Sequence, residues 1–243
     1  NDHALSYIHS DTSDLVATAV QNPSGDQRSY VIWGNTGSPS NPDMPNDIYK
    51  CQILRPNGGS LQFISFYRTL DEAADAAQNG DVIEVFRSHT TANTVWLNKN
   101  ITVRRAPVGT NPVSQAAPAE SDDITVTRNM HLNASMVVVS DSVTHHDDGT
   151  VTHTPVDVNI QNLTFDGSGT DMNHNGFDVA SRMHLSNVNV RNFTSSVDKN
   201  GQPTSAVWVW DGTEKDDCAQ DDVCSINQMM GEGVIYLSNT VNV

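Results

Sequence analysis

The sequence predicts an all-β chain folded as a right-handed parallel β-helix, a solenoid of about 25 residues per coil with a short N-terminal capping helix. Three observations support this prediction. A short helix signal at residues 69–80 runs directly into a strand signal. Short β-branched runs then recur between loops rich in Asn, Asp, Gly and Thr. A short sequence motif containing Asn also recurs several times in the second half of the chain.

The helix signal has a defined start and a defined end. Thr69 and Glu72 have the spacing of a capping box. The apolar side chains form one stripe at helical spacing: Leu70, Ala73, Ala74 and Ala77. Asn79 and Gly80 are expected to supply the left-handed residue that ends the helix. A helix this short buries little surface alone, so we expect it to cover the first apolar edge of a stack.

The chain is expected to contain three segments. Residues 1–60 are polar and rich in Pro, and they predict an irregular segment whose short strands, at 30–33 and 48–54, cover the first coil. Residues 61–80 predict a strand and the capping helix. Residues 81–243 predict the β-helix, and the uncapped strand expected at 234–243 predicts further coils or another chain at that end.

The spacing of the repeated motif sets the expected length of a coil. Asn162 and Asn187 are 25 residues apart, and Asn239 follows after 52 more, which we interpret as two coils of 26. Asn tolerates a left-handed backbone at sharp corners and can bond to its neighbour in the next coil. Ordinary turn preference explains these asparagines equally well. The remaining runs expected as strands are 95–103, 124–132, 136–139, 156–165, 183–193 and 206–210.

Composition narrows the class of partner. Thirteen Lys and Arg against 29 Asp and Glu give a formal net charge of -16, which repels phosphate backbones and anionic lipids. No apolar run approaches the roughly 20 residues that span a bilayer. We therefore expect no nucleic-acid partner and no membrane insertion. Cys218 and Cys224 are close enough to form a loop disulfide, although three free thiols fit the sequence as well.

The loop at residues 166–178 is the densest polar segment. Asp171 and Asp178 are seven residues apart and are expected to face each other across a groove, with His174 between them. Two carboxyl groups about 5 to 5.5 Å apart suit retaining glycoside hydrolysis, and their mutual repulsion raises the pKa of one. Two alternatives remain open, a solvated loop and a calcium site built from Asp166, Asp171 and Asn173. No cofactor is expected to be required.

The sequence Val207-Trp208-Val209-Trp210 alternates like a half-buried strand. If the valines point inward, both tryptophans stand on the outer face, where they can stack on sugar rings. Asp211 follows and could accept sugar hydroxyls. The competing register places the tryptophans inside.

Histidines and aspartates also cluster at residues 145–153. Adjacent histidines on a loop rarely face one point, so we expect a solvated loop here and not a metal site.

Residues 66–85, together with the run at 95–103, resemble the opening of pectin-lyase-like β-helix domains. The sequence of residues 66–85 is Phe66-Tyr67-Arg68-Thr69-Leu70-Asp71-Glu72-Ala73-Ala74-Asp75-Ala76-Ala77-Gln78-Asn79-Gly80-Asp81-Val82-Ile83-Glu84-Val85. Such domains are frequent in secreted and surface proteins of Gram-positive gut bacteria. Within this superfamily, the Asp171 and Asp178 spacing is similar to that of the catalytic aspartates of the β-helical lacto-N-biosidases of bifidobacteria. The resemblance implies release of lacto-N-biose with retention, with Asp171 as acid/base and Asp178 as nucleophile.

Three functions are therefore expected from the sequence. The first is a secreted or surface glycoside hydrolase with Asp171 and Asp178 as the catalytic pair and a sugar site lined by His174, Trp208, Trp210 and Asp211. The second is a non-catalytic, glycan-binding adhesin module of the same fold. The third is a structural spacer in a longer surface protein.

Overall fold

The computed structural model describes the backbone of residues 16–21 and 27–32, and residues 49–132, 134–168, 174–193, 204–210 and 233–243 in full. The chain divides into two compact units, residues 1–49 and 50–243. In the first unit, β1 (Val16–Gln21) and β2 (Gln27–Ile32) form an antiparallel hairpin. Everything below concerns the second unit.

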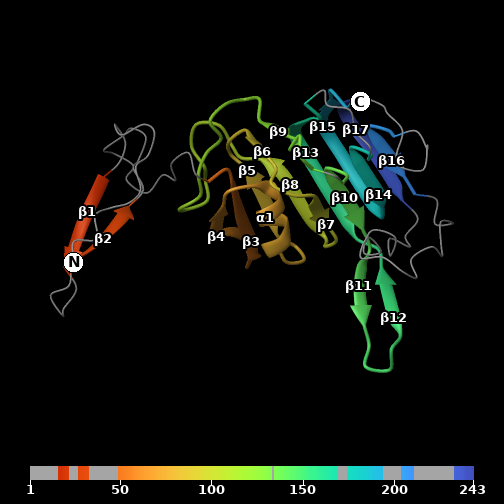
Figure 1. The fold of residues 1–243 in the computed structure, drawn as a ribbon, viewed down its shortest axis with the longest axis horizontal. Coiled ribbons are helices and arrows are strands. Elements are labelled where there is room, and N and C mark those ends of the chain that lie inside the picture. Colours follow the sequence, from red (N-terminus) through yellow and green to blue (C-terminus); the bar gives the residue numbers. More distant parts are fainter. Residues whose placement is uncertain are drawn as a thin grey trace. The chain divides into compact units, whose positions relative to one another are not determined.

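Two sheets dominate the second unit (Figure 1). The small sheet contains four parallel strands in the order β16 (Val207–Val209), β14 (Phe177–Ala180), β10 (Val137–Ser140) and β7 (Val95–Leu97). The main path of the large sheet is β17 (Val234–Asn242), β15 (Arg182–Arg191), β13 (Asp157–Asp166), β8 (Ile101–Arg105), β5 (Val82–Val85), β3 (Cys51–Asn57) and β4 (Ser60–Tyr67). Two short strands extend it, β6 (His89–Thr90) and β9 (Thr125–Thr127).

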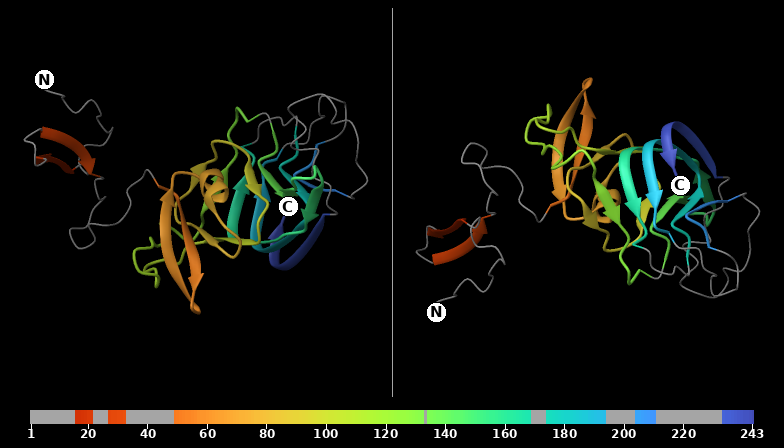
Figure 2. Two further views of the ribbon diagram at one scale, coloured as in Figure 1. Left: turned by 90° about the horizontal axis from the view of Figure 1, so that it is seen from below. Right: turned by 90° about the horizontal axis from the view of Figure 1, so that it is seen from above.

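The chain alternates between the two sheets. It passes from β10 in the small sheet to β13 in the large one, and then through β14, β15, β16 and β17 in the same alternation. Neighbouring strands are parallel from β5 to β17, and the stack can be followed along both sheets in Figure 2. The all-β class expected from the sequence is confirmed.

The core lies between the inward faces of the two sheets. Phe165 from the large sheet and Phe177 from the small sheet pack edge to face with ring centroids 5.0 Å apart. Both are almost completely buried, as are the aliphatic residues two positions away, Leu163 and Val179. Burying each such side chain stabilises the fold by about 1.5 to 3 kcal/mol, so these contacts hold the sheets together.

The helix α1 (Leu70–Ala76) begins as the sequence predicts and ends differently. The hydroxyl of Thr69 accepts from the backbone N–H of Glu72, and the apolar stripe is buried. The helix ends at Ala76, and Gly80 takes its positive φ of 89° later, in the following turn, so the expected glycine cap is wrong. Ala77 has an extended backbone, and the Lys99 ammonium group donates to the carbonyls of Ala74 and Asp75 at 3.1 and 3.2 Å, which satisfies them without a glycine cap.

Asparagine occupies the corners of the long strands, as predicted. Asn162, Asn187 and Asn239 have φ of 56°, 53° and 58°, the left-handed region that most side chains avoid. The Asn187 amide donates to the Asn162 side-chain oxygen at 3.1 Å, and the Asn239 amide continues the ladder to Ser186 at 2.7 Å. Each corner therefore bends its strand and bonds to the next one.

The expected coil length holds for only one step. Asn162 and Asn187 are 25 residues apart on adjacent strands. Asn239 and Ser186 are 53 residues apart and also lie on adjacent strands, so the interpretation of this interval as two coils is wrong. Asp157 likewise pairs with Asn100 across 57 residues. Strand pairing fixes the register, whereas the number of residues between adjacent strands varies widely because the connecting loops differ in length.

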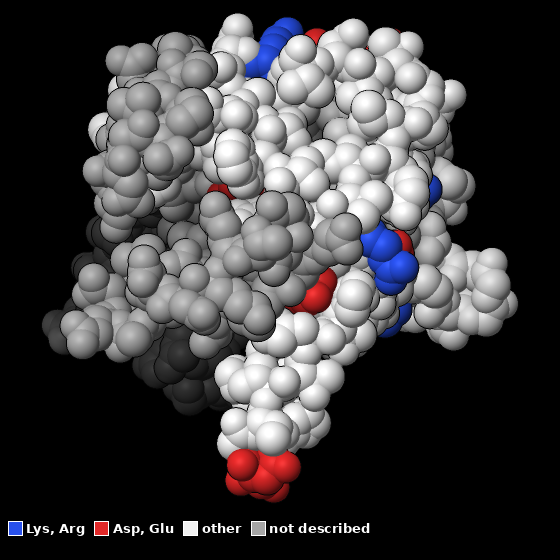
Figure 3. Space-filling view, turned by 90° about the vertical axis from the view of Figure 1, so that its right-hand side faces the viewer, with Lys and Arg blue, Asp and Glu red and all other residues white. Residues whose placement is uncertain are grey.

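The structure of residues 142–154 also differs from the sequence prediction. The expected solvated loop is an antiparallel hairpin, β11 (Ser142–His145) and β12 (Val151–Thr154), that projects from the sheets (Figure 1). Its turn contains Asp148 and Gly149, the latter with φ of 81°, and Asp-Gly is a strong hairpin signal that was overlooked. Figure 3 shows acidic side chains gathered at the tip.

The last strand keeps an exposed apolar surface. In β17, Tyr236 is 48% exposed and Leu237 is 63% exposed. The expectation that more coils or another chain cover this surface remains a prediction. Among the residues that the structure describes, no helix has the length and hydropathy to cross a bilayer.

The variant Asn187→Ala tests whether the left-handed backbone at this position carries a steric cost. Replacing Asn187 by Ala should destabilise the chain by about 1 kcal/mol more than replacing it by Gly, because only Gly accepts the left-handed backbone without steric cost. Both variants lose the amide ladder, so the difference between them isolates the backbone term. Urea unfolding monitored by circular dichroism measures it, and equal losses in the two variants would show that the corner carries no strain.

Candidate functional site

The outer face of the small sheet brings the sequence-predicted site residues together. Trp96, Val138, Asp178 and Trp208 occupy one row across its four strands. The adjacent rows, which include Phe177 and Val179, face the core. Val207 and Val209 align with these inward residues, so Trp208 and Trp210 point outward, in agreement with the first of the two registers considered.

Asp178 is buried on this outward face. Its Oδ2 atom accepts from the Ser135 hydroxyl at 2.5 Å, and its Oδ1 atom accepts from the Asn175 amide at 2.7 Å. Only 5% of the residue is exposed. Burial raises the pKa of Asp178 above the ordinary value of 3.8, while the hydrogen bonds from Ser135 and Asn175 oppose the rise.

Polar cross-links between loops hold Asp178 in place. The Thr94 hydroxyl donates to the Ser135 carbonyl at 2.8 Å, and the backbone N–H of Ser205 donates to the Asn175 side-chain oxygen at 2.9 Å. These residues lie just before the strands of the small sheet. The carboxyl group therefore sits in a chain of hydrogen bonds that ties the starts of all four strands together.

An apolar cluster flanks the carboxyl group on the same face. Val138 and Ala180 are almost completely buried and pack against Trp96 and Trp210. The Trp210 indole N–H also lowers the pKa of Asp178, but it does not reach hydrogen-bonding geometry, so the buried Nε1 atom has no partner among the described residues. Trp208 remains 37% exposed, one strand away from Asp178.

The other predicted site residues have different outcomes. His174 lies close enough to lower the pKa of Asp178 electrostatically. Asp171 and Asp211 lie outside the described residues, as do Cys218 and Cys224. The paired-carboxylate arrangement therefore remains a prediction. Cys51, by contrast, is a free buried thiol whose pKa is raised by burial.

Of the three residues considered as calcium ligands, only Asp166 lies among the described residues. The Asp166 carboxylate accepts hydrogen bonds from the Ser168 N–H, the Asn192 amide and the Arg191 guanidinium. These bonds hold its pKa below the ordinary value despite partial burial, which acts in the opposite direction. Asp171 and Asn173 lie outside the described residues. The part of the chain that the structure describes contains no group of three or more His, Cys, Asp or Glu side chains arranged to hold a metal ion.

Sequence reasoning missed Ser135 and Thr94. Ser135 is 43 residues from Asp178 and contacts it only because β10 and β14 are neighbours in register. A local signal for it existed, since Ser135 directly precedes the buried run that contains Val137 and Val139. Its partner could not be identified without the strand order.

Comparison of the chain with protein-family models, with curated proteins and with solved structures found no match.

Asp178→Asn should change how stability depends on pH. Because the folded state raises the pKa of Asp178, the folded protein binds this proton more tightly, and wild-type stability falls as the pH rises from 3.8 through the folded pKa. The Asn variant lacks this loss, so its stability relative to wild type should improve as the pH rises above 3.8. Urea unfolding across this range measures the trend.

Asp148→Asn, at the hairpin tip, is the control for that experiment. Hydrogen bonds from Thr150 lower the pKa of Asp148, so its contribution to stability changes mainly below pH 3.8, and Asp148→Asn should show no improvement at higher pH. An unchanged slope in Asp178→Asn would show that the carboxyl group is not perturbed.

Ser135→Ala should raise the pKa of Asp178 further, because it removes a hydrogen bond that stabilises the ionised carboxylate. A carbon-13 NMR titration of the Asp178 carboxyl carbon measures this directly. Ser60→Ala, in the turn between β3 and β4, should leave that titration unchanged. A fall in the pKa of Asp178 in the Ser135 variant would contradict the assigned role.

Proposed function

We propose that the second unit is a right-handed parallel β-helix whose small-sheet outer face acts on oligosaccharides as an extracellular or cell-surface glycoside hydrolase. Support for the fold comes from the alternation between two parallel sheets and from the left-handed asparagine corners. The handedness follows the general rule for parallel crossovers.

One observation carries the proposed function. Asp178 is a buried carboxyl group with a raised pKa, and Trp208 is partly exposed on the neighbouring strand, about 4.8 Å away in the sheet. Burial favours the protonated form of the Asp178 carboxyl group, and a protonated carboxyl group can donate a proton to a leaving glycosidic oxygen. An indole next to it offers a flat apolar surface for a sugar ring.

The environment of Asp178 favours one catalytic role over the other. A raised pKa suits a general acid, whereas a nucleophile must be ionised. We therefore assign the acid to Asp178 and the second carboxylate to Asp171, the reverse of the roles that the resemblance to lacto-N-biosidases implies. His174, Trp208, Trp210 and Asp211 would line the sugar site, and neither a metal nor another cofactor is needed for this chemistry.

A glycan-binding adhesin module is the second candidate, and a specific observation favours it. Both oxygens of Asp178 already accept hydrogen bonds, from Ser135 and Asn175, in a 5% exposed position. A carboxylate engaged in this way can fix the loops without any catalytic role. Trp208 would then contact the glycan without any bond being cleaved.

Incubation with lacto-N-tetraose, together with a glycan array, tests the proposal. The hydrolase predicts release of lacto-N-biose that falls at least a hundredfold in Asp178→Asn, the low end of the effect of general acid–base catalysis. Trp208→Ala should weaken glycan binding in both candidates.

Asp157→Asn, an exposed acid on the large sheet, is the matched control and should retain full activity. Glycan binding without product formation would select the adhesin module. Neither binding nor product would overturn both candidates and favour the structural spacer.

A further inference from the structure

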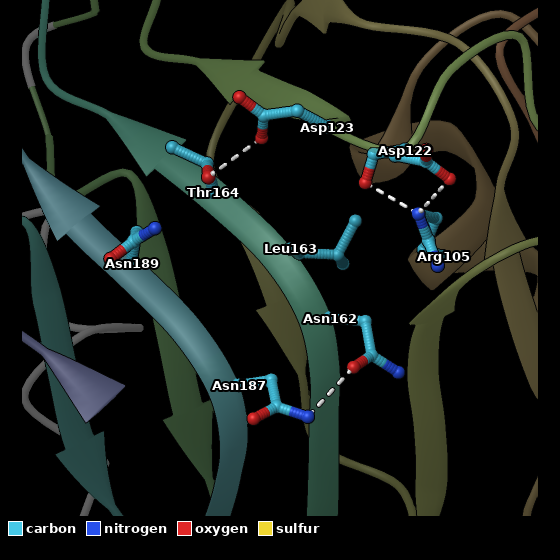
Figure 4. Close-up of a pocket in the computed structure, with 8 residues that line it drawn as sticks. All are labelled: Arg105, Asp122, Asp123, Asn162, Leu163, Thr164, Asn187 and Asn189. Carbon is cyan, nitrogen blue, oxygen red and sulfur yellow. Dashed lines mark hydrogen bonds and ion pairs between the residues drawn. The ribbon is translucent and has the colours of Figure 1, made fainter. Parts of the chain in front are cut away.

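A gap in the large sheet creates a polar hollow on a different face from Asp178. β8 ends at Arg105 and β9 begins at Thr125, while β13 continues past both. β13 pairs with β8 as far as Gln161 and with β9 from Thr164 onward. Asn162 and Leu163 therefore have no strand beside them on that side, and the sheet is open there (Figure 4).

The loop that leaves the sheet at this gap is firmly anchored. The backbone N–H of Ala117 donates to the Gln52 side-chain oxygen at 2.7 Å, and the Asn111 amide donates to Glu84 at 2.9 Å. Gln52 and Glu84 are completely buried. Arg104 pairs with Glu84 at 2.7 Å and offsets its buried charge. The gap is thus built into the fold.

The hollow encloses about 230 Å³ and is lined mainly by polar side chains, among them Arg105, Asp122, Asp123, Asn162, Asn187 and Asn189. Ligand sites usually have volumes of about 300 to 1,000 Å³, so this one suits a ligand no larger than a single ring. It lies on the large sheet, whereas Asp178 lies on the small sheet.

The asparagine ladder leaves hydrogen-bond donors at the hollow. The Asn162 side-chain oxygen accepts from Asn187, so among the described residues its amide N–H₂ keeps its donors. Figure 4 shows this amide nitrogen directed away from Asn187. The Asn189 oxygen accepts from Asn242 at 2.7 Å, which likewise leaves the Asn189 N–H₂ group for another partner.

The hollow carries charges of both signs, one guanidinium group and two carboxylate groups. The Arg105 guanidinium donates to the backbone carbonyl of Asp122 at 2.5 Å and contacts its carboxylate at 3.3 Å. The Asp123 carboxylate accepts from the Thr164 hydroxyl at 3.2 Å. A cation would meet the guanidinium, and an anion would meet two carboxylates. The lining suits a neutral ligand whose groups both donate and accept hydrogen bonds, as sugar hydroxyls do.

We propose that this hollow binds one ring of a neutral saccharide. The site lies outside the proposed catalytic face and does not require hydrolysis. In either candidate function it adds a second glycan contact, and two linked contacts raise the apparent affinity for a multivalent glycan surface without a new enzyme activity.

Saturation-transfer NMR on the full chain tests the proposal with four neutral probes, the methyl glycosides of glucose, galactose, mannose and N-acetylglucosamine. At least one should receive saturation in the wild type. Arg105→Met should weaken this binding about tenfold, the effect of losing a charge-assisted hydrogen bond. Asn189→Ala is a second variant, at an exposed position, that should also weaken it.

Two comparisons separate this site from the proposed catalytic face. Binding that persists in Trp208→Ala and Asp178→Asn but weakens in Arg105→Met belongs to the hollow. Asp147→Asn, at the hairpin tip, is the control and should bind like the wild type. The methyl glycoside of galacturonic acid, in which a carboxylate replaces the C6 hydroxymethyl group of galactose, should bind less well than the methyl galactoside.

The opposite results would overturn the proposal. These are equal binding by wild type and both hollow variants, no saturation of any neutral probe, tighter binding of the galacturonic acid glycoside, or displacement of the sugar by calcium. Loss of lacto-N-tetraose hydrolysis in Asp178→Asn bears only on the proposed function, so the two ideas fail independently.

Discussion

The left-handed asparagine corner is the constraint on which the rest of the structure depends. At Asn162, Asn187 and Asn239 a single residue reverses the sign of φ and bends a long strand. Most side chains pay a steric penalty there, while Asn can recover stability through local hydrogen bonds. Stacked amides then connect one corner to the next. The same corner recurs in β13, β15 and β17, so these neighbouring strands of the large sheet bend at matching positions.

The corner also explains where polar groups gather. The two halves of β13 have different neighbours on either side of the bend. The half before Asn162 pairs with β8, and the half after Leu163 pairs with β9. The backbone between them is left beside an open hollow. A straight strand with one continuous neighbour would have closed this space with ladder hydrogen bonds.

Asp178 shows how a carboxyl group can be buried on an outward face. The sheet itself does not cover it, since Val138 and Trp208 are its neighbours in the row. The loops before β10 and β14 supply Ser135 and Asn175, which enclose the carboxyl group and satisfy both oxygens. Full hydrogen bonding makes this burial tolerable, and desolvation still shifts the pKa upward. Stability and a candidate proton donor thus arise from one arrangement.

The sequence alone determined the features that depend on near neighbours in the chain. These are the Thr69 cap, the buried helix stripe, the preference of Asn for sharp corners and the alternation at residues 207–210, because side-chain spacing and backbone preference act locally. Which side chains of that alternation point outward was decided only by the strand register. The Asp148-Gly149 hairpin turn was equally local and was overlooked. Only the tertiary structure decided the strand order, the unequal lengths of chain between adjacent strands, the gap beside Asn162 and the partners of Asp178. These depend on contacts such as Ser135 with Asp178, 43 residues apart, which no local pattern encodes.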